Sequence, residues 1–328
     1  MKYRTLGKTG FTVSEISLGT WQLGGVWGSE FDRANADAIL ETAFESGIDF
    51  FDTADVYSDG LSEKAVGAFA KRHAGKVRFA TKCGRRLNPH VAASYTPEAL
   101  RAFVEDSLKN TGLERLDLVQ LHCPPTEVYY RPEIFGLFER LREEGKVAHL
   151  GVSVEKVEEA LKAIEYANVE TVQIIFNMFR QRPGELFFRE AAARNIGVIV
   201  RVPLASGLLT GKFGEKTAFA KDDHRNFNRN GEAFDKGETF SGIPYDAGLR
   251  ATERLKEVFP LEPPLALMAL RWILDHPQVS CVIPGASRPD QIRSNCRASD
   301  LPPLSESEHQ IVKRIYEVDI KPLVHHLW

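Results

Sequence analysis

The stretch GIDFFDTADVYSDGLSEKAVGAFAKRH, residues 47–73, contains a strand-like segment, a short loop and a helix-like segment. The run IDFFD (48–52) is short, apolar and ends on a carboxylate, as expected of a strand that is buried on both faces. The run LSEKAVGAFAKRH (61–73) places apolar residues at helical spacing, and we predict Ser62 as its N-cap. Tyr57 lies in the loop between them. A strand followed by a helix is the repeating unit of an α/β fold.

The same unit recurs between residues 15 and 298. Helical patterns separate the strand-like runs, and the clearest is 96–112, with Thr96 as N-cap and Pro97 at the first helical position. Eight successive units predict a (β/α)8 TIM barrel. A doubly wound sheet is the rival fold, but no G-x-G-x-x-G motif follows a strand. The predicted strands are 15–21, 47–54, 77–83, 116–123, 147–153, 171–177, 197–203 and 279–285.

Three segments lie outside these units. Residues 3–13 alternate around two glycines and predict a hairpin that closes the N-terminal end of the barrel. Residues 212–245 form a polar connection after the seventh strand, long enough to serve as a lid. The Ser305–Glu308 capping box predicts a C-terminal helix, followed by the tail KPLVHHLW (321–328), in which we expect His325 and His326 to be exposed. We interpret residues 1–328 as one domain.

Bulk composition excludes several classes of function. The chain has 328 residues, a net charge of −3 and 43% hydrophobic content. This charge gives no reason to expect a nucleic acid or an anionic membrane as a partner. The first ten residues, MKYRTLGKTG, lack the apolar core of a signal peptide, and no apolar run reaches membrane-spanning length.

The cysteine pattern favours a reducing, cytoplasmic location. The chain has four cysteines (Cys83, Cys123, Cys281 and Cys296) and no CxxC pair or histidine-spaced cluster. Cys83 and Cys123 each follow a residue with candidate chemistry. Because neighbouring residues on a strand point to opposite sides, we expect both thiols to face the surrounding helices.

Four polar residues are placed where a barrel would bring them together. Asp52, Lys82 and His122 end three successive strand-like runs, and Tyr57 follows the first of these. In a barrel, the C-terminal ends of the strands share one rim. Lys82 can lower the pKa of Tyr57, Asp52 can hold Lys82 charged, and His122 can orient a carbonyl oxygen. Tyr57 would then protonate that oxygen as hydride reaches the carbon, which makes all four candidate catalytic residues.

This arrangement resembles the aldo-keto reductase superfamily, in particular its bacterial NADPH-dependent members. The resemblance extends over nearly the whole chain, from YRTLGKTGFTVSEISLGTW (3–21) to SRPDQIRSN (287–295), and is most specific in GIDFFDTADVYSDGLSEKAVG (47–67). It implies a (β/α)8 barrel that binds NADP(H) without a Rossmann motif. It also implies the catalytic tetrad of that family, with none of the four residues missing.

The resemblance implies three groups of cofactor contacts. Those at the nicotinamide are Gly19, Thr20, Trp21, Asp52, Ser153, Gln173 and Arg201. Those at the pyrophosphate lie in PLASGLLTGK and are Pro203, Leu204, Ser206, Gly207, Leu208, Gly211 and Lys212. Those at the adenine end are Gly285, Ser287, Arg288, Gln291 and Asn295. Ser287 and Arg288 suit a 2′-phosphate and favour NADP(H) over NAD(H), although a simple capping turn would also explain this last segment.

Two positions depart from the family pattern. Val154 follows Ser153 where many members have asparagine, which removes one contact to the carboxamide. Arg201 stands where many have a tyrosine that stacks on the nicotinamide. Arg201 could raise the reduction potential of bound cofactor, or meet an acidic substrate. Alternatively, it pairs with a nearby carboxylate.

The remaining signals concern the pocket. Trp21 and Trp27 are predicted to line the substrate pocket with Tyr57 and His122. The run 222–225 could be read as metal ligands, but the predicted chemistry needs no metal, and we favour a loop that is solvated or clasps the cofactor.

We expect the chain to reduce the carbonyl of a small-molecule aldehyde, ketone or sugar. One alternative is an NADP-dependent sugar or polyol dehydrogenase that uses the same site in the oxidative direction. Another is a cofactor-binding interaction module, as in the potassium-channel β subunits that resemble this family. The substrate and the oligomeric state stay open.

Overall fold

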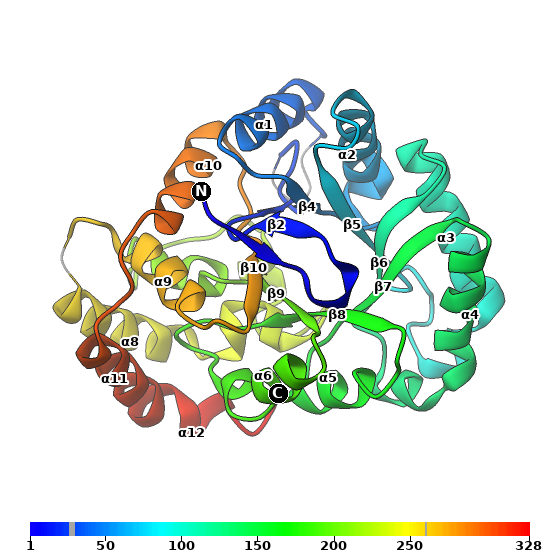
Figure 1. Ribbon diagram of the computed structural model, residues 1–328. Coiled ribbons are helices and arrows are strands. Elements are labelled where there is room, and N and C mark those ends of the chain that lie inside the picture. The colour runs from blue at the N-terminus through cyan, green and yellow to red at the C-terminus, as the bar shows by residue number, and fades with distance from the viewer. Residues whose placement is uncertain (26–29, 260) are drawn as a thin grey trace.

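The computed structural model describes residues 1–25, 30–259 and 261–328. A ring of parallel strands lies inside a layer of helices, which confirms the predicted (β/α)8 barrel (Figure 1). The ring is formed by β3 (Leu18–Gly19), β4 (Phe50–Asp52), β5 (Arg78–Cys83), β6 (Leu116–His122), β7 (Val147–Ser153), β8 (Val169–Ile175), β9 (Gly197–Arg201) and β10 (Val279–Val282). The helices are α1 (Arg33–Glu45), α2 (Leu61–Arg72), α3 (Pro97–Thr111), α4 (Pro132–Glu143), α5 (Val157–Ala163), α6 (Phe187–Ala193), α7 (His224–Phe227), α8 (Tyr245–Val258), α9 (Leu265–Leu274), α10 (Pro289–Cys296), α11 (Glu306–Ile315) and α12 (Lys321–Val324).

The strands pair in chain order from β3 to β10. The first and last strands are joined by two parallel bridges, Ile16 to Val282 and Gly19 to Gly285. A backbone hydrogen bond from Ser17 N to the Val282 carbonyl, 2.9 Å long, supports the first bridge. The sheet therefore closes on itself.

Residues that point into the barrel change character along the strands. At the start of the strands, the inward side chains are apolar, as with Phe50 and Leu118. Two residues further along, β4 carries Asp52 and β6 carries Gln120, and both are buried. The residues between them, such as Phe51, pack outward against the helices. Side chains alternate between the two faces of a strand, so every second residue points into the barrel. These inward residues are apolar at the floor and polar at the C-terminal mouth.

The predicted N-terminal hairpin closes the floor. β1 (Tyr3–Thr5) pairs antiparallel with β2 (Thr12–Ser14), and the hairpin lies across the ring in Figure 1. Leu6 and Val13 are fully buried against the apolar floor. Gly7 has a φ of +51°, and a Cβ there would lie 2.0 Å from the backbone nitrogen of Gly197. The hairpin therefore seals the barrel through a backbone approach that only glycine permits.

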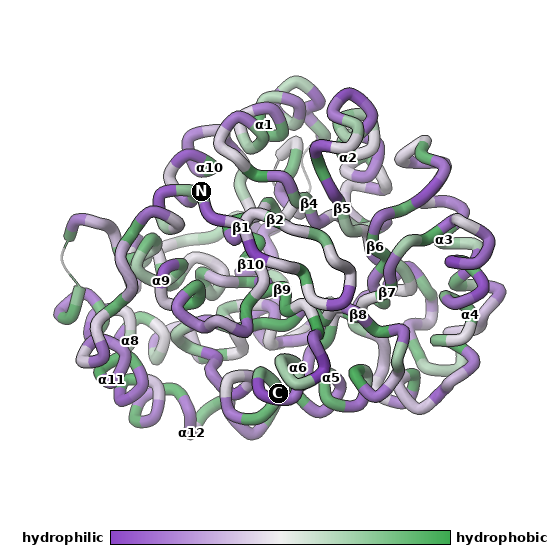
Figure 2. The backbone as a smooth tube through the Cα atoms, in the orientation of Figure 1, coloured by the Kyte–Doolittle hydropathy of each residue, from purple (hydrophilic) through white to green (hydrophobic). Residues whose placement is uncertain are grey.

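The predicted start and end of helix α3 are confirmed. Thr96 accepts a hydrogen bond from Ala99 N, Pro97 is the first residue of α3, and Gly112 ends that helix in the left-handed region. The tube in Figure 2 alternates between green and purple along the outer helices, as expected of helices with one apolar face. The prediction that Ser62 caps α2 was wrong. Gly60 is the N-cap. Ser62 is buried, and its hydroxyl forms hydrogen bonds with the hydroxyls of Thr20 and Thr53.

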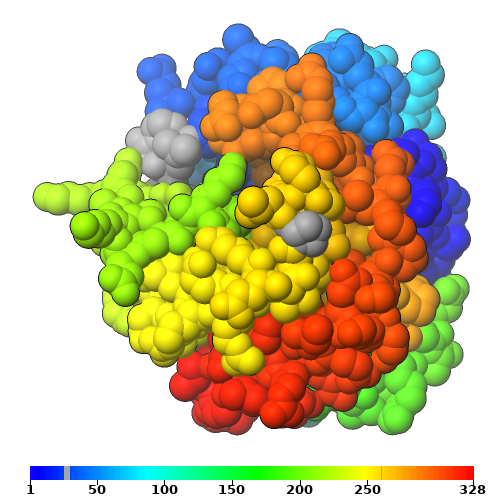
Figure 3. Space-filling view, turned by 90° about the vertical axis from the view of Figure 1, so that its left-hand side faces the viewer, coloured from blue at the N-terminus to red at the C-terminus, as the bar shows by residue number. Residues whose placement is uncertain are grey.

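The C-terminal tail is held against the barrel. His326 is exposed as expected, whereas His325 is half-buried and its Nδ1 pairs with the Tyr316 hydroxyl. The Ser305–Glu308 capping box is present at the start of α11. In Figure 3, α8 (yellow) lies against the C-terminal segment (red), and an ion pair joins Arg254 and Asp319. Trp328 is 7% exposed, and its indole nitrogen donates to Asp235 over 2.8 Å. The tail has an apolar partner because α8 and the long connection 212–245 lie beside it.

Within the described ranges, no helix combines the length and the apolar character that a bilayer span requires.

Candidate active site

The structure brings the four predicted catalytic residues together at the C-terminal mouth. Asp52 ends β4, Lys82 lies in β5, His122 ends β6, and Tyr57 starts the 3₁₀ turn after β4. The Lys82 ammonium forms an ion pair with Asp52 and donates to the Tyr57 hydroxyl over 3.3 Å. The rings of Tyr57 and His122 meet edge to face, with centroids 6.1 Å apart. The predicted juxtaposition is therefore present.

The Asp52 carboxylate is held by two further side chains. Gln173 donates to its Oδ2 over 2.7 Å, and Gln120 donates to the same oxygen over 3.0 Å. Lys82 takes Oδ1, so both oxygens of this buried carboxylate are satisfied. Sequence reasoning missed Gln120, although it lies two residues before His122 and must therefore share its inward face.

The expected net lowering of the Tyr57 pKa is not found. Burial of the phenol raises its pKa, and this outweighs the lowering by Lys82. Burial lowers the pKa of Lys82, but Asp52 and Tyr57 outweigh it, so the net pKa of Lys82 is raised. Burial, followed by the charge of Arg85, lowers the pKa of His122 well below its usual value. At neutral pH, the site thus holds a protonated phenol, a charged lysine and a neutral imidazole.

The predicted nicotinamide contacts cluster around the tetrad. Ser153 ends β7, Gln173 lies in β8 and Arg201 ends β9, all at this mouth. Thr20 is buried, and its hydroxyl donates to the Asp52 carbonyl oxygen over 2.9 Å. It therefore positions the strand end. Gly19 lies where a Cβ would come 2.8 Å from the Ile283 carbonyl oxygen, so closure of the barrel itself requires glycine there.

The predicted pyrophosphate loop forms a 3₁₀ turn over Ala205–Thr210. Ser206 and Gly207 have positive φ values of 53° and 101°. The Ser206 hydroxyl donates to the Glu238 carbonyl oxygen over 3.1 Å and accepts from Phe240 N over 3.0 Å. In this structure, the turn therefore fastens the long connection to the barrel.

The predicted adenine segment is a capping turn at the start of α10. The Gln291 side chain accepts hydrogen bonds from the backbone nitrogens of Ser287 and Arg288. The Arg288 guanidinium is exposed and contacts Asp290 at 3.1 Å. The turn explains Gln291 without a ligand, and it leaves Arg288 accessible at the surface.

Arg201 pairs with two carboxylates, which was the alternative to a role beside the cofactor or an acidic substrate. Its Nη2 lies 2.9 Å from Glu155, and its Nη1 lies 3.6 Å from Glu238. Nη2 also donates to the Val154 carbonyl oxygen over 3.0 Å. These three contacts fix the guanidinium at the mouth.

The two cysteines that follow tetrad residues have different surroundings. Cys83 packs into the outer apolar core, as expected. The expectation for Cys123 was wrong. Its backbone has a φ of +48°, so the strand alternation ends at His122, and its sulfur lies 3.5 Å from Arg201 Nη2.

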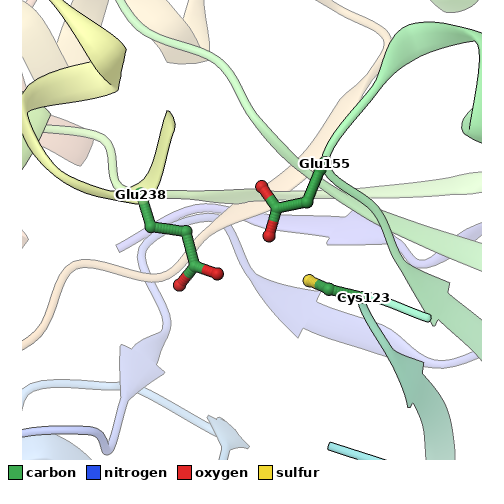
Figure 4. Close-up of side chains that lie close together, drawn as sticks. All are labelled: Cys123, Glu155 and Glu238. Carbon is green, nitrogen blue, oxygen red and sulfur yellow. The ribbon is translucent and has the colours of Figure 1, made fainter. Parts of the chain in front are cut away.

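Glu155 and Glu238 are candidate site residues that sequence reasoning missed. Figure 4 shows their carboxylates pointing toward each other, with the Cys123 sulfur nearby. One ligand atom from each of the three residues lies within 4.8 Å of the others, a spacing compatible with a metal ion. However, Arg201 contacts all three side chains and supplies the positive charge there. We therefore interpret the group as the surroundings of a guanidinium.

The aromatic predictions had mixed outcomes. Trp21 contacts the ring of His224, with centroids 4.6 Å apart. Trp27 lies outside the described residues. Asp223 caps α7 and pairs with Arg225, so these side chains serve the local fold of the long connection.

A hollow of about 730 Å³ lies at the opposite end of the barrel, beside the hairpin. It is lined in part by Arg4, Arg271 and Asp275. Because the tetrad lies at the other mouth, this hollow does not belong to the candidate site.

The chain is similar to known proteins over nearly its whole length. The profile of the Aldo/keto reductase family matches residues 15–317. The chain is 31% identical to the aldo-keto reductase YhdN of Bacillus subtilis over 90% of this chain and 87% of that protein. It is 27% identical to the NADH-specific methylglyoxal reductase of Escherichia coli over 97% and 99% of the two chains. It also resembles the solved glycerol dehydrogenase AKR11B4 of Gluconobacter oxydans, with a TM-score of 0.77, 28% identity and coverage of 98% and 96%.

Proposed function

Because the chain belongs to the aldo/keto reductase family, we propose that it is an NADPH-dependent oxidoreductase that reduces aldehyde or ketone carbonyls to alcohols. One observation carries the proposal: the Tyr57 hydroxyl lies 3.3 Å from the Lys82 ammonium, which is itself paired with Asp52. This contact places a proton donor beside a fixed positive charge in a site largely shielded from water. Such a pair stabilises the phenolate that remains after proton transfer.

In the proposed reaction, bound NADPH would supply the hydride. The neutral His122 orients the carbonyl oxygen, and Tyr57 delivers its proton to that oxygen. Lys82 stabilises the phenolate that forms, and Asp52 keeps the lysine charged and in place. The raised pKa of Tyr57 supports this direction, because the phenol is fully protonated at neutral pH. The same tyrosine, once ionised, would act as the base for alcohol oxidation.

The mouth offers polar groups that fit a nicotinamide nucleotide. Among the residues that the structure describes, His122 Nδ1 and Arg201 Nε are buried without a hydrogen-bond partner. Buried polar atoms normally have a partner, so these two suit a polar ligand. Gly19, Trp21, Ser153 and Gln173 would hold the nicotinamide end. The turn at 203–212 and the segment 285–295 would hold the remainder.

The preference for NADP(H) rests on the adenine end. Arg288 is exposed at the N-terminus of α10, where a 2′-phosphate would meet a guanidinium and backbone amides. Its present partner, Asp290, is also exposed and can be displaced. Equal affinity for NADPH and NADH in a fluorescence titration would remove this preference while leaving the reaction class intact.

The oxidative direction is a second candidate. The similarity to a glycerol dehydrogenase favours a small polyol or sugar as the alcohol substrate. A third candidate is a binding module without turnover, as in potassium-channel β subunits. The complete tetrad does not exclude it, and the turnover assay described below separates it from the reductase.

A screen of carbonyl compounds and polyols with both cofactors tests the proposal. We expect NADPH oxidation with several aldehydes. In Tyr57→Phe, we expect turnover to fall by about 10³-fold or more, while the Kd for NADPH changes by less than about threefold. Turnover like that of the wild type in this variant would remove Tyr57 from proton transfer. Cofactor that binds but is oxidised by no compound would favour the binding module.

A further inference from the structure

Five charged residues form a cluster at the C-terminal mouth, here called the mouth cluster: Arg85, Glu155, Arg180, Arg201 and Glu238. They come from four different loops or strand ends and from the long connection, and none belongs to the tetrad. The three arginines outnumber the two carboxylates. Since the long connection supplies one member, the cluster exists only in the folded chain.

The Glu238 carboxylate sits between two guanidiniums. It lies 2.9 Å from Arg85 Nη1 and 3.6 Å from Arg201 Nη1. These two arginines come from separate elements, the loop after β5 and the end of β9. Guanidiniums are well suited to bind carboxylates because their N–H groups match the spacing of the two oxygens. The pair thus forms a carboxylate site that the protein fills with its own side chain.

The cluster carries an excess of positive charge. Burial raises the pKa of Glu155, and Arg85 and Arg201 hold the pKa of Glu238 low despite its burial. Glu155 therefore keeps a proton that Glu238 does not. Burial lowers the pKa of Arg180 to about 10, so this side chain remains charged at neutral pH. The Asp235 carboxylate offsets the charge of Arg180. Arg85 and Arg201 both face the Glu238 carboxylate, and this pair of guanidiniums favours an anionic ligand.

The two guanidiniums lie close to the tetrad. Arg201 Nη2 is 3.5 Å from the sulfur of Cys123, the residue that follows His122, and Arg85 shares the Glu238 carboxylate with Arg201. In agreement with this placement, both charges lower the pKa of His122, after the larger effect of burial. The Arg201 side chain is 10% exposed, and its Nε has no hydrogen-bond partner among the described atoms. A ligand at this position would meet an unused donor.

Glu238 can leave without disturbing the backbone that carries it. Its side chain is about one-fifth exposed, whereas the segment 235–242 is anchored by other groups. Ser206 holds the Glu238 carbonyl oxygen, Trp328 holds Asp235, and Asn177 donates to the Ser241 hydroxyl over 2.9 Å. Rotation of one side chain would therefore open the site.

We propose that Arg85 and Arg201 form a substrate subsite for a carboxylate group, and that the Glu238 carboxylate fills it until the substrate displaces it. The inference rests on the proposed function, since it names the substrate class: carbonyl compounds that carry a carboxylate. Glu238 then acts as an internal competitor, which selects against neutral carbonyl compounds because only an anion can replace it.

The test compares 4-oxobutanoate with its neutral methyl ester, two aldehydes that share the reacting end. In Arg85→Met, we expect KM for 4-oxobutanoate to rise roughly 10–100-fold and KM for the ester to change less than about twofold. Arg86→Met is the matched control, since that neighbouring arginine is exposed and lies 3.9 Å from Asp106 on the outside. It should leave both KM values unchanged. In Glu238→Gln, we expect KM for 4-oxobutanoate to fall several-fold.

A merely structural ion pair gives a different result. Arg85→Met and Glu238→Gln would then each raise KM for 4-oxobutanoate and KM for the ester by similar factors. This result in either variant would overturn the proposal. Weaker NADPH binding in Arg85→Met without any change in discrimination would also overturn it, because the anion would then belong to the cofactor.

Succinate, which has no reducible carbonyl, separates this inference from the proposed function. Calorimetry should show that succinate binds the wild type and Arg86→Met with similar affinity. It should bind Arg85→Met at least tenfold more weakly. If no aldehyde is reduced but this binding pattern holds, the subsite stands and the reductase assignment fails. If aldehydes are reduced but succinate binding is the same in all three proteins, the subsite fails alone.

Discussion

Inside the ring of strands, the two ends of the barrel differ in how completely their polar groups are satisfied, although Arg271 Nη1, in α9 on the hairpin side, also has no partner among the described residues. At the hairpin end, the inward side chains are apolar and fully buried, as with Leu6 and Leu118. At the C-terminal mouth, His122, Arg180 and Arg201 each keep a buried polar atom without a hydrogen-bond partner among the described residues. The hairpin end of the ring is packed like a protein core, whereas the C-terminal mouth has polar atoms that a ligand could pair with.

The backbone shows the same contrast. Non-glycine residues with positive φ at the mouth include Cys123, Val202, Ser206 and Ser241. Such conformations cost energy and persist where the surrounding structure imposes them. Near the hairpin, Gly7 takes a positive φ at no steric cost, and Asn195 beside it is a non-glycine exception. The barrel therefore places most of its strained non-glycine residues where its chemistry is proposed.

The largest effect should come from disrupting the buried ion pair between Asp52 and Lys82 at the mouth. Lys82→Met leaves the Asp52 carboxylate buried without its cation, so we expect the free energy of unfolding to fall by about 3–5 kcal/mol. The double variant Asp52→Asn/Lys82→Met should lose less, because no charge is left uncompensated. Urea denaturation measures both. A double variant that is less stable than Lys82→Met would contradict a charge-based explanation.

The hairpin end should respond in the opposite way. Leu118→Ala opens a cavity in the apolar floor, and we expect a loss of about 2–5 kcal/mol in unfolding free energy. Because the floor lies away from the tetrad, kcat/KM of the folded protein should stay within about twofold. Assays below the unfolding transition check this. A large loss of kcat/KM would show that the two ends are coupled.

Asp55 is a smaller test of the mouth. It is 2% exposed, both of its oxygens lack partners among the described atoms, and burial raises its pKa to about 7. The folded protein then keeps a proton that the unfolded chain releases near pH 4, so this group costs stability as pH rises from about 4 to about 7. Asp55→Asn removes that dependence. We expect the variant to gain about 1–3 kcal/mol on the wild type between pH 4 and pH 8, within a ceiling of about 4 kcal/mol set by the shift.

Thermal or urea unfolding across this pH range provides the measurement. Parallel pH profiles for the two proteins would show that Asp55 ionises normally.

The smallest expected effect lies in the outer layer, away from both ends. Thr96→Ala removes the hydrogen bond to Ala99 N at the start of α3, and we expect a loss of about 1 kcal/mol with unchanged kinetics. Thr96→Ser keeps the hydroxyl and should restore most of the stability. Equal melting temperatures for the alanine and serine variants would mean that the cap contributes nothing.

The parts of the fold that sequence predicted are those governed by local periodicity. Alternation placed Asp52, Lys82 and His122 on inward positions at strand ends, and barrel geometry then brought them to one rim. Gln120 followed from the same rule but was overlooked.

The parts that sequence did not predict depend on long-range packing. Glu238 comes from a connection without helical or strand periodicity, so nothing local indicates that it meets Arg85 and Arg201. Cys123 turned toward the mouth because the backbone leaves the strand at that residue. The net pKa of Tyr57 depends on how deeply the folded protein buries it, which composition does not reveal.

The docking of Trp328 affects how the protein should be engineered. Its indole holds Asp235 and lies under the guanidinium of Arg180, whose centre is 4.5 Å from the ring, so the last side chain helps to support the segment that carries Glu238. A purification tag or fluorescent fusion joined after Trp328 would pull on that support. The amino group of Met1 lies 3.3 Å from Asp300, on the hairpin side, and offers an attachment point far from the mouth.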